Sequence, residues 1–158
     1  MAKDTPSMAK NKIKRSLGAI LDPHPSAKDI SMLWGYFGHS CIYCGLSMDR
    51  TSRHGHLDHV IATSEGGNNS IYNHVLACAK CNGDEKREMD WLDFLRSKAK
   101  TDQEYNKRKL IVESWLAKNS VQNINQALNV EAEDIIAKAL KDFDSAVEQM
   151  RTLRKSII

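Results

Sequence analysis

Four cysteines, arranged as two Cys-x-x-Cys pairs, constrain the fold of this 158-residue chain more than any other feature. The first pair is Cys41 and Cys44, the second is Cys78 and Cys81, and together they are all the cysteines in the sequence. Both sulfurs of a Cys-x-x-Cys turn can bind the same metal ion, and two such pairs complete a tetrahedral zinc site. The spacing therefore predicts one structural Zn²⁺ ion bound by four thiolates.

Disulfides and a redox pair are the two other uses of such cysteines. The sequence shows no apolar signal segment and no run long enough to cross a membrane, so we expect a cytoplasmic protein without a membrane partner, where disulfides are rare. A thioredoxin-type redox site uses one pair after a strand-to-helix unit, whereas this chain has two pairs and neither follows such a unit. Both arguments favour zinc.

The pattern around the cysteines predicts two short strands and a helix. Residues 57–62 are rich in Val and Ile, residues 64–69 have the composition of a loop, and residues 71–77 form a second apolar run. A polar helix is expected after Cys78, through Lys86 and Arg87. Because residues 41–88 are too few to bury a sizeable core, we expect this module to need its zinc ion to fold.

Helices are expected on both sides of this module. The first begins after Ser26, whose spacing to Asp29 is that of a capping pair, and ends at Gly38. Its apolar residues recur at helical spacing: Ile30, Leu33, Trp34 and Phe37. Two helices after residue 89 have apolar faces, formed by Trp91, Leu92 and Leu95 in the first and by Tyr105, Ile111, Val112, Trp115 and Leu116 in the second, which should end near Asn119.

A last helix is expected to begin at Asn129 as its N-cap. Its apolar residues alternate steps of four and three along the sequence: Ile136, Leu140, Phe143, Val147 and Met150. This spacing is typical of a seam that packs against one partner helix. The partner is either another helix of the same chain or a second copy in a homodimer.

We therefore predict an α+β fold that is mostly α, in three parts. These are a basic N-terminal arm (residues 1–25), the zinc-bearing ββα domain with its preceding helix (residues 26–96) and a helical C-terminal region (residues 97–158). The net charge of +3 is compatible with a nucleic-acid partner. The arm is either a solvated terminus or a segment that contacts DNA phosphates through Lys10, Lys12, Lys14 and Arg15.

The residues between and after the cysteine pairs suit the hydrolysis of a phosphodiester bond. His59 can act as a base near neutral pH, because an imidazole titrates there. Asp58 offers a carboxylate oxygen of the kind that Mg²⁺ or Mn²⁺ prefers, and Asn82 adds an amide oxygen. Since Asn82 follows the zinc ligand Cys81, the structural zinc ion should also fix its position.

The order of these residues resembles the HNH endonuclease family in its zinc-bearing form, with asparagine at the last motif position. The resemblance covers about residues 39–88 and rests on Cys41 and Cys44, Leu57-Asp58-His59-Val60-Ile61, Gly66-Gly67, Asn73, and Cys78 through Asn82. It implies a ββα-metal finger that acts on DNA. It also implies that His59 is the general base, that Asp58 and Asn82 hold the catalytic Mg²⁺ or Mn²⁺, and that Asn73 braces the loop and orients the histidine.

The sequence departs from the family pattern at two positions near the site. His74 stands where leucine is common, and Glu85 stands where a lysine is common, with Lys86 next to it. If that lysine contacts phosphate, its role either passes to Lys86 or Arg87 or is weakened. We therefore expect a metal-dependent endonuclease that cuts one strand per active site. The alternative is a zinc-stabilised nucleic-acid-binding module that does not cleave, although such a module has no use for a base beside a carboxylate.

Overall fold

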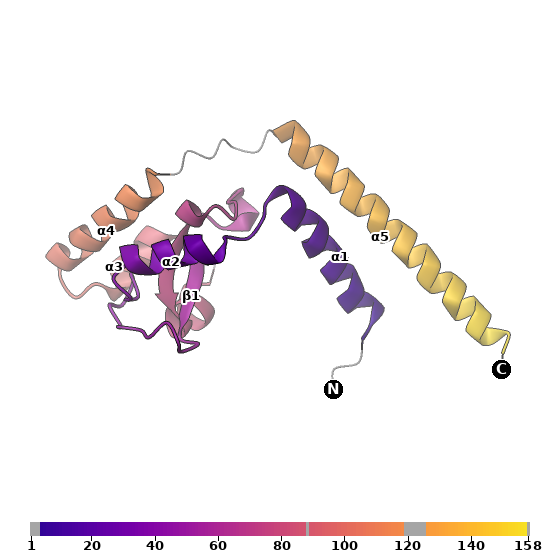
Figure 1. Cartoon of the computed structure of the whole chain (residues 1–158), viewed down its shortest axis with the longest axis horizontal. Coiled ribbons are helices and arrows are strands. Elements are labelled where there is room, and N and C mark those ends of the chain that lie inside the picture. The colour runs from indigo at the N-terminus through magenta and orange to yellow at the C-terminus, as the bar shows by residue number, and fades with distance from the viewer. Residues whose placement is uncertain (1–3, 88, 119–125, 158) are drawn as a thin grey trace. The chain divides into compact units, whose positions relative to one another are not determined.

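The computed structural model describes residues 4–87, 89–118 and 126–157, and for residues 126–129 it describes the backbone alone (Figure 1). The chain forms two compact units. One contains residues 24–121, and the other combines residues 1–23 with residues 122–158. The described elements are mostly helical, with one two-stranded antiparallel sheet, as the sequence predicts.

The sheet of the first unit pairs β1 (Gly55–His59) with β2 (His74–Cys78). Its register places Gly55 opposite Cys78 and His59 opposite His74. Both strands are shorter than predicted. β1 ends at His59 instead of continuing to residue 62, and the segment before β2 forms a 3₁₀ turn, η2 (Ile71–Asn73), instead of a strand. The short 3₁₀ turn η1 (Thr63–Glu65) lies in the loop between the strands, and η3 (Lys80–Lys86) follows β2, which completes the predicted order of strand, loop, strand and helix.

Helix α2 (Ala27–Tyr36) begins where the sequence predicts. Ser26 Oγ accepts a hydrogen bond from the backbone N–H of Asp29 at 3.2 Å, and the Asp29 carboxylate accepts one from the Ser26 N–H at 3.0 Å. These reciprocal bonds satisfy N–H groups that the first turn of a helix leaves without a partner. The helix ends at Tyr36 with Phe37 as its C-cap, and Gly38 follows with a φ of +56°.

Helices α3 (Trp91–Lys98) and α4 (Asp102–Leu116) belong to the same unit as the sheet. The core joins residues of α2, β2, α3 and α4, among them Leu33, Trp34, Val75, Leu76, Phe94, Leu95, Val112 and Trp115. Trp115 is 1% exposed, and its indole Nε1–H donates to the backbone carbonyls of Ile71 at 3.2 Å and His74 at 2.8 Å. The division therefore differs from the predicted boundary between residues 96 and 97, because α4 supplies part of the core around the sheet.

The second unit consists of α1 (Pro6–Leu21), which packs along α5 (Gln126–Lys155). Helix α1 occupies most of the segment that the sequence assigns to a basic N-terminal arm. Thr5 caps it by accepting a hydrogen bond from the Met8 N–H at 3.3 Å, and Pro6 suits its first turn. Ile13 and Leu17, one turn apart, are half-buried.

The predicted seam of the last helix is half-buried at Ile136, Leu140, Phe143 and Val147, whereas Met150 is 67% exposed. Because α5 packs along α1, the seam has a partner helix within the chain. Asn129 lies inside α5 and is not its N-cap. The predicted end of the preceding helix at Asn119 lies outside the described residues, and α4 itself ends at Leu116.

Candidate active site

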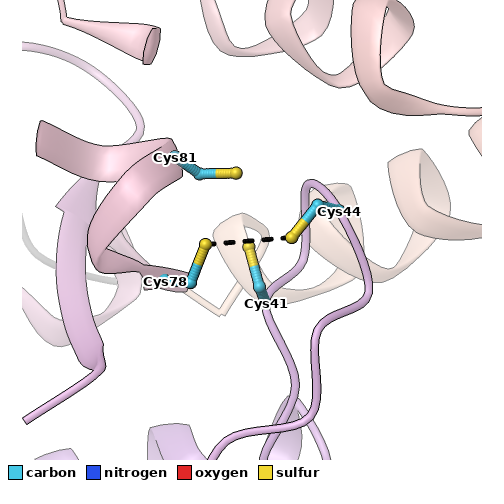
Figure 2. A group of neighbouring side chains, drawn as sticks. All are labelled: Cys41, Cys44, Cys78 and Cys81. Carbon is cyan, nitrogen blue, oxygen red and sulfur yellow. Dashed lines mark hydrogen bonds between the residues drawn. The ribbon is translucent and has the colours of Figure 1, made fainter. Parts of the chain in front are cut away.

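The four cysteine sulfurs converge on one point (Figure 2). All four Sγ atoms lie within 4.8 Å of one another, and those of Cys44 and Cys78 are 3.8 Å apart. Sulfurs at the corners of a tetrahedron around zinc are also about 3.8 Å apart, given a zinc–sulfur distance of about 2.3 Å. The pairs come from the turn after α2 and from the junction of β2 with η3. The donor set and its spacing fit a structural Zn²⁺ ion.

The environment of these thiols favours a bound cation. Burial raises the pKa of the Cys41 thiol to about 11, and burial together with the neighbouring Cys41 raises the pKa of the Cys81 thiol further. Four thiolates held this close repel one another, so they need a cation to remain ionised at neutral pH. A Zn²⁺ ion would supply that charge, and its binding would release protons.

Tyr43 lies between Cys41 and Cys44 and joins the turn that these cysteines form to Asp58, the predicted catalytic carboxylate. Its side chain is 1% exposed, and its hydroxyl donates to Asp58 Oδ2 at 2.6 Å. Burial, with the nearby Asp58 charge, raises the pKa of Tyr43, so the hydroxyl keeps its proton at neutral pH. The sequence alone does not identify this residue as part of the site. An aromatic side chain inside a Cys-x-x-Cys turn suggests burial near the metal, but no spacing indicates contact with Asp58.

His59 ends β1 and is half-buried. Its Nε2 lies 3.2 Å from the Asn69 side-chain oxygen. An amide oxygen can only accept a hydrogen bond, so Nε2 is the donor in this contact, and in the neutral imidazole the lone pair is then on Nδ1. The contact therefore leaves the imidazole in a tautomer that can take a proton at Nδ1. Asn69 lies in the predicted loop, but the composition of that loop does not indicate which of its residues contacts His59.

His74 packs against the His59 ring from the opposite position in the sheet. The two ring centroids are 4.1 Å apart at an interplanar angle of 50°. His74 is 3% exposed, and its Nδ1–H donates to the Ser70 carbonyl at 2.8 Å. The histidine that replaces the common leucine is thus a buried neighbour of the predicted base.

Asn73 joins the two ends of the loop between the strands. It is 3% exposed, its Oδ1 accepts from the Ile61 N–H at 3.0 Å, and its Nδ2 donates to the carbonyls of Ile61 at 3.0 Å and Asn68 at 2.9 Å. Its backbone carbonyl also accepts from the Val60 N–H at 2.8 Å. These bonds hold the segment that follows His59. Among the bonds found in the described residues, none joins the Asn73 side chain to the His59 ring.

Asp58 is buried, with an exposed fraction of 6%, and a lysine accompanies it. Lys86 Nζ lies 3.2 Å from Asp58 Oδ2, 3.4 Å from Oδ1 and 3.1 Å from the His59 carbonyl oxygen. Burial raises the pKa of the Asp58 carboxyl, and the Tyr43 hydroxyl and the Lys86 ammonium act in the opposite direction. Lys86 is 5% exposed, so its position differs from the surface DNA contact that the sequence suggested, whereas Arg87 is exposed.

Lys86 ends η3, which is a π-helix. A π-helix forms hydrogen bonds over five residues and so accommodates one residue more per turn than an α-helix. The sequence places this lysine one position later than the family pattern does. From the end of this wider turn, the Lys86 ammonium reaches Asp58 and the His59 carbonyl at the end of β1. Asn82, the other predicted cation ligand, is half-buried on the same helix.

The predicted Mg²⁺ or Mn²⁺ site does not fit a divalent ion in this arrangement. Such ions bind carboxylate oxygens at about 2.0 to 2.1 Å and usually keep several water ligands. Here both oxygens of Asp58 contact the Lys86 ammonium, and one also accepts the Tyr43 hydrogen bond. The carboxylate is therefore paired with a side-chain cation and shielded from solvent.

The predicted DNA-contacting residues of the N-terminal segment lie on helix α1. Lys10 is paired with Asp144 of α5 at 2.7 Å, whereas Lys12, Lys14 and Arg15 are exposed. Side chains three or four residues apart are neighbours on a helix. Lys14 therefore shares one flank with Lys10, and Lys12 shares another with Arg15, so the four charges do not form a single stripe.

Gly67 of the Gly-Gly pair is required by close packing. A Cβ atom at this position would lie 1.9 Å from the Ile61 carbonyl oxygen, whereas a Cβ at Gly35 in α2 would meet no atom within 4 Å. We expect Gly67→Ala to destabilise the chain by about 1–3 kcal/mol, because the backbone has to move. Gly35→Ala, the matched control, should be neutral or stabilising by up to about 1 kcal/mol. Thermal or urea unfolding measures both, and equal effects would contradict the packing argument.

Comparison with known proteins identifies the segment that carries the site. The family model described as HNH endonuclease matches residues 41–91. This match confirms the resemblance seen in the sequence and spans all four cysteines, both strands and η3, but neither α1 nor α5. A search of curated proteins found no match. Within the part of the chain that the structure describes, no helix is both long and apolar enough to cross a membrane.

Proposed function

We propose that this chain is a DNA endonuclease that hydrolyses phosphodiester bonds with His59 as its general base. The observation that carries the proposal is the contact between His59 Nε2 and Asn69, at 3.2 Å, within the segment that matches the HNH endonuclease model. This contact leaves Nδ1 able to accept the proton of an attacking water molecule. A half-buried imidazole at the end of a strand can also reach a substrate, which a fully buried one cannot.

The neighbours of His59 suit a base that has to keep one orientation. Asn69 holds one ring nitrogen and His74 packs on the ring face, so both restrict rotation of the side chain. Asn73 fixes the loop that carries Asn69 by bonding to Ile61 and Asn68. Each of these contacts is weak alone. Together they keep the imidazole within a narrow range of angles, so it spends more time in an orientation that can take a proton.

The HNH resemblance also implies a catalytic Mg²⁺ or Mn²⁺ ion, which would neutralise charge on the phosphate when bound. Asp58 and Asn82 are the candidate ligands in this proposal, although in the structure the Asp58 carboxylate is paired with Lys86. Asn82 follows the zinc ligand Cys81, and Asp58 is bonded to Tyr43 in the other zinc turn. The zinc site is thus linked to Asn82 through the peptide bond from Cys81 and to Asp58 through the Tyr43 hydrogen bond. It would position both candidate ligands without taking part in the chemistry.

One base per chain implies one strand cut per active site. A double-strand break would require a second site, which a homodimer could supply. Because the α5 seam already packs along α1, a homodimer through the C-terminal helices would have to use other residues of these helices. We therefore propose that a single chain nicks one strand of DNA.

A nicking assay separates the endonuclease from the alternative, a zinc-stabilised module that binds nucleic acid without cleaving it. Zinc-loaded protein is incubated with supercoiled plasmid in Mg²⁺, in Mn²⁺ and without added divalent ions. The proposal expects open-circular product that depends on the added ion. Binding to the plasmid without any nicking in either ion would favour the binding module.

The exposed basic residues of α1 are expected to strengthen DNA binding without changing its chemistry. Replacing Lys12, Lys14 and Arg15 with glutamine should lower affinity and reduce the slope of log affinity against log salt by up to about three, since each lost phosphate contact releases about one counterion fewer. The control replaces three exposed lysines elsewhere, Lys28, Lys107 and Lys138, with the same change in charge. Fluorescence anisotropy at several salt concentrations measures both, and equal slopes would show that α1 makes no phosphate contact.

A further inference from the structure

The ion pair between Lys86 and Asp58 has the features of a built site. Lys86 Nζ lies within 3.4 Å of three oxygens, namely both Asp58 carboxylate oxygens and the His59 carbonyl oxygen. An ammonium group has three N–H donors, so these three acceptors satisfy it. The two side chains are 5% and 8% exposed, which protects the pair from solvent screening. The Lys86 ammonium is therefore held by three buried contacts, unlike the ammonium of a solvent-exposed ion pair.

The same carboxylate is the candidate ligand for the divalent cation. An ion at coordination distance from Asp58 would lie a few ångströms from the Lys86 ammonium, and like charges repel strongly in such a poorly screened place. The Tyr43 hydroxyl, 2.6 Å from Oδ2, further reduces the lone pairs that Asp58 can offer. A divalent ion and the Lys86 ammonium thus cannot both bind this carboxylate closely.

We propose that the Lys86 ammonium competes with the divalent cation for Asp58, so that the metal ion binds only when Lys86 leaves the carboxylate. This inference rests on the proposed function, because it takes Asp58 as a ligand of the catalytic ion. Lys86 is the last residue of η3, and its carbonyl accepts a hydrogen bond from the Met89 N–H at 2.8 Å. A lysine side chain is long and flexible, so its ammonium can leave Asp58 while the backbone of η3 stays in place.

Lys86 would then set the metal concentration that the site needs. With a competing cation that is part of the chain, the apparent affinity for metal equals the intrinsic affinity multiplied by the fraction of time that the carboxylate is free. Because Mn²⁺ binds nitrogen and oxygen sites and loses water more readily than Mg²⁺, it should displace Lys86 at lower concentration. Lys86 takes no part in the hydrogen bond from Tyr43 to Asp58, so that bond would keep the carboxylate in place after Lys86 has left.

The test compares two lysines of η3 in the zinc-loaded full chain. Lys86→Gln removes the competing cation, and Lys80→Gln makes the same change in charge at a side chain that is 75% exposed. Mn²⁺ binding is followed by electron paramagnetic resonance. We expect Lys86→Gln to bind Mn²⁺ about tenfold more tightly than the wild type and Lys80→Gln to bind it within about twofold of the wild type. Equal or weaker binding by a folded Lys86→Gln protein would overturn the proposal.

A second measurement needs no variant and therefore holds even if Lys86→Gln does not fold. In the wild-type chain, acetylation by a lysine-reactive reagent is quantified at each lysine by mass spectrometry. Lys86 should be protected without added metal and become reactive as Mn²⁺ saturates the site, while Lys80 reacts in both conditions. Lys86 that stays protected at saturating Mn²⁺ would overturn the proposal.

These readouts are separate from catalysis. If metal displaces Lys86 but neither the wild type nor Lys86→Gln nicks plasmid, the competition stands and the proposed endonuclease function fails. If the wild type nicks plasmid but Lys86→Gln needs as much metal as the wild type for half-maximal rate, the proposed function stands and the competition fails.

Discussion

Replacing Cys81 with alanine is expected to unfold residues 24–121 and to abolish zinc binding. Structural zinc contributes on the order of 10 kcal/mol in small domains, which is comparable to the whole stability of a domain. Cys81 is 1% exposed, and its Sγ atom lies within 4.8 Å of the other three sulfurs. A water molecule therefore cannot easily take its place as the fourth zinc ligand. The measurements are zinc content by atomic spectroscopy and thermal unfolding followed by tryptophan fluorescence.

Asn82→Ala is the matched control, because it changes the next residue and leaves all four thiolates in place. It should keep one zinc ion per chain and a melting temperature near that of the wild type.

The wild-type chain should lose zinc as the pH falls, because burial raises the pKa of Cys41 to about 11 and protons compete with the metal for such thiolates. A Cys81→Ala protein that keeps wild-type zinc content and stability would contradict the four-cysteine site.

Replacing His59 with alanine is expected to remove most of the nicking activity while leaving the fold intact. Loss of a general base typically lowers the rate by about 10² to 10⁴. His59 is only half-buried, and among the described residues its side chain contacts Asn69 through a hydrogen bond and packs against the His74 ring. Zinc content, melting temperature and DNA affinity should therefore change little, whereas the rate of plasmid nicking falls.

His56→Ala is the control for this prediction. His56 lies on the same strand, three residues before the proposed base, and its side chain is exposed. It should nick plasmid at close to the wild-type rate. If His59→Ala nicks as fast as the wild type, the assignment of the base is wrong and the proposed mechanism fails with it.

The elements that the sequence predicts well are those with strong local or pairwise signals. Two Cys-x-x-Cys pairs predict a common site whatever lies between them, and the structure brings the four sulfurs together. The cap of α2 depends on Ser26 and Asp29, which are three residues apart, so that local spacing is enough. The apolar face of α4 was likewise visible, since Val112 and Trp115 recur at helical spacing and both are buried.

The features that the sequence does not reveal depend on contacts between distant side chains or on weak patterns. The pair of Asp58 and Lys86 joins residues 28 positions apart, and the bond from Tyr43 to Asp58 joins residues 15 apart. No periodicity encodes such meetings. Helix α1 was missed because its apolar residues, such as Ile13 and Leu17, are few and only half-buried. The π-helix was missed because residue propensities distinguish it poorly from an α-helix.

The position of Trp115 has a practical consequence for anyone who isolates the catalytic segment. The family match ends at residue 91, but the indole of Trp115 donates to two carbonyls that flank Asn73, and Tyr36 donates through its hydroxyl to the Ile111 carbonyl at 3.1 Å. A fragment cut at the end of the match would lose these bonds and expose the apolar residues beneath α4. The smallest expressible piece that keeps the site should therefore extend through α4, to about residue 118, and the evolutionary module is shorter than the folding unit.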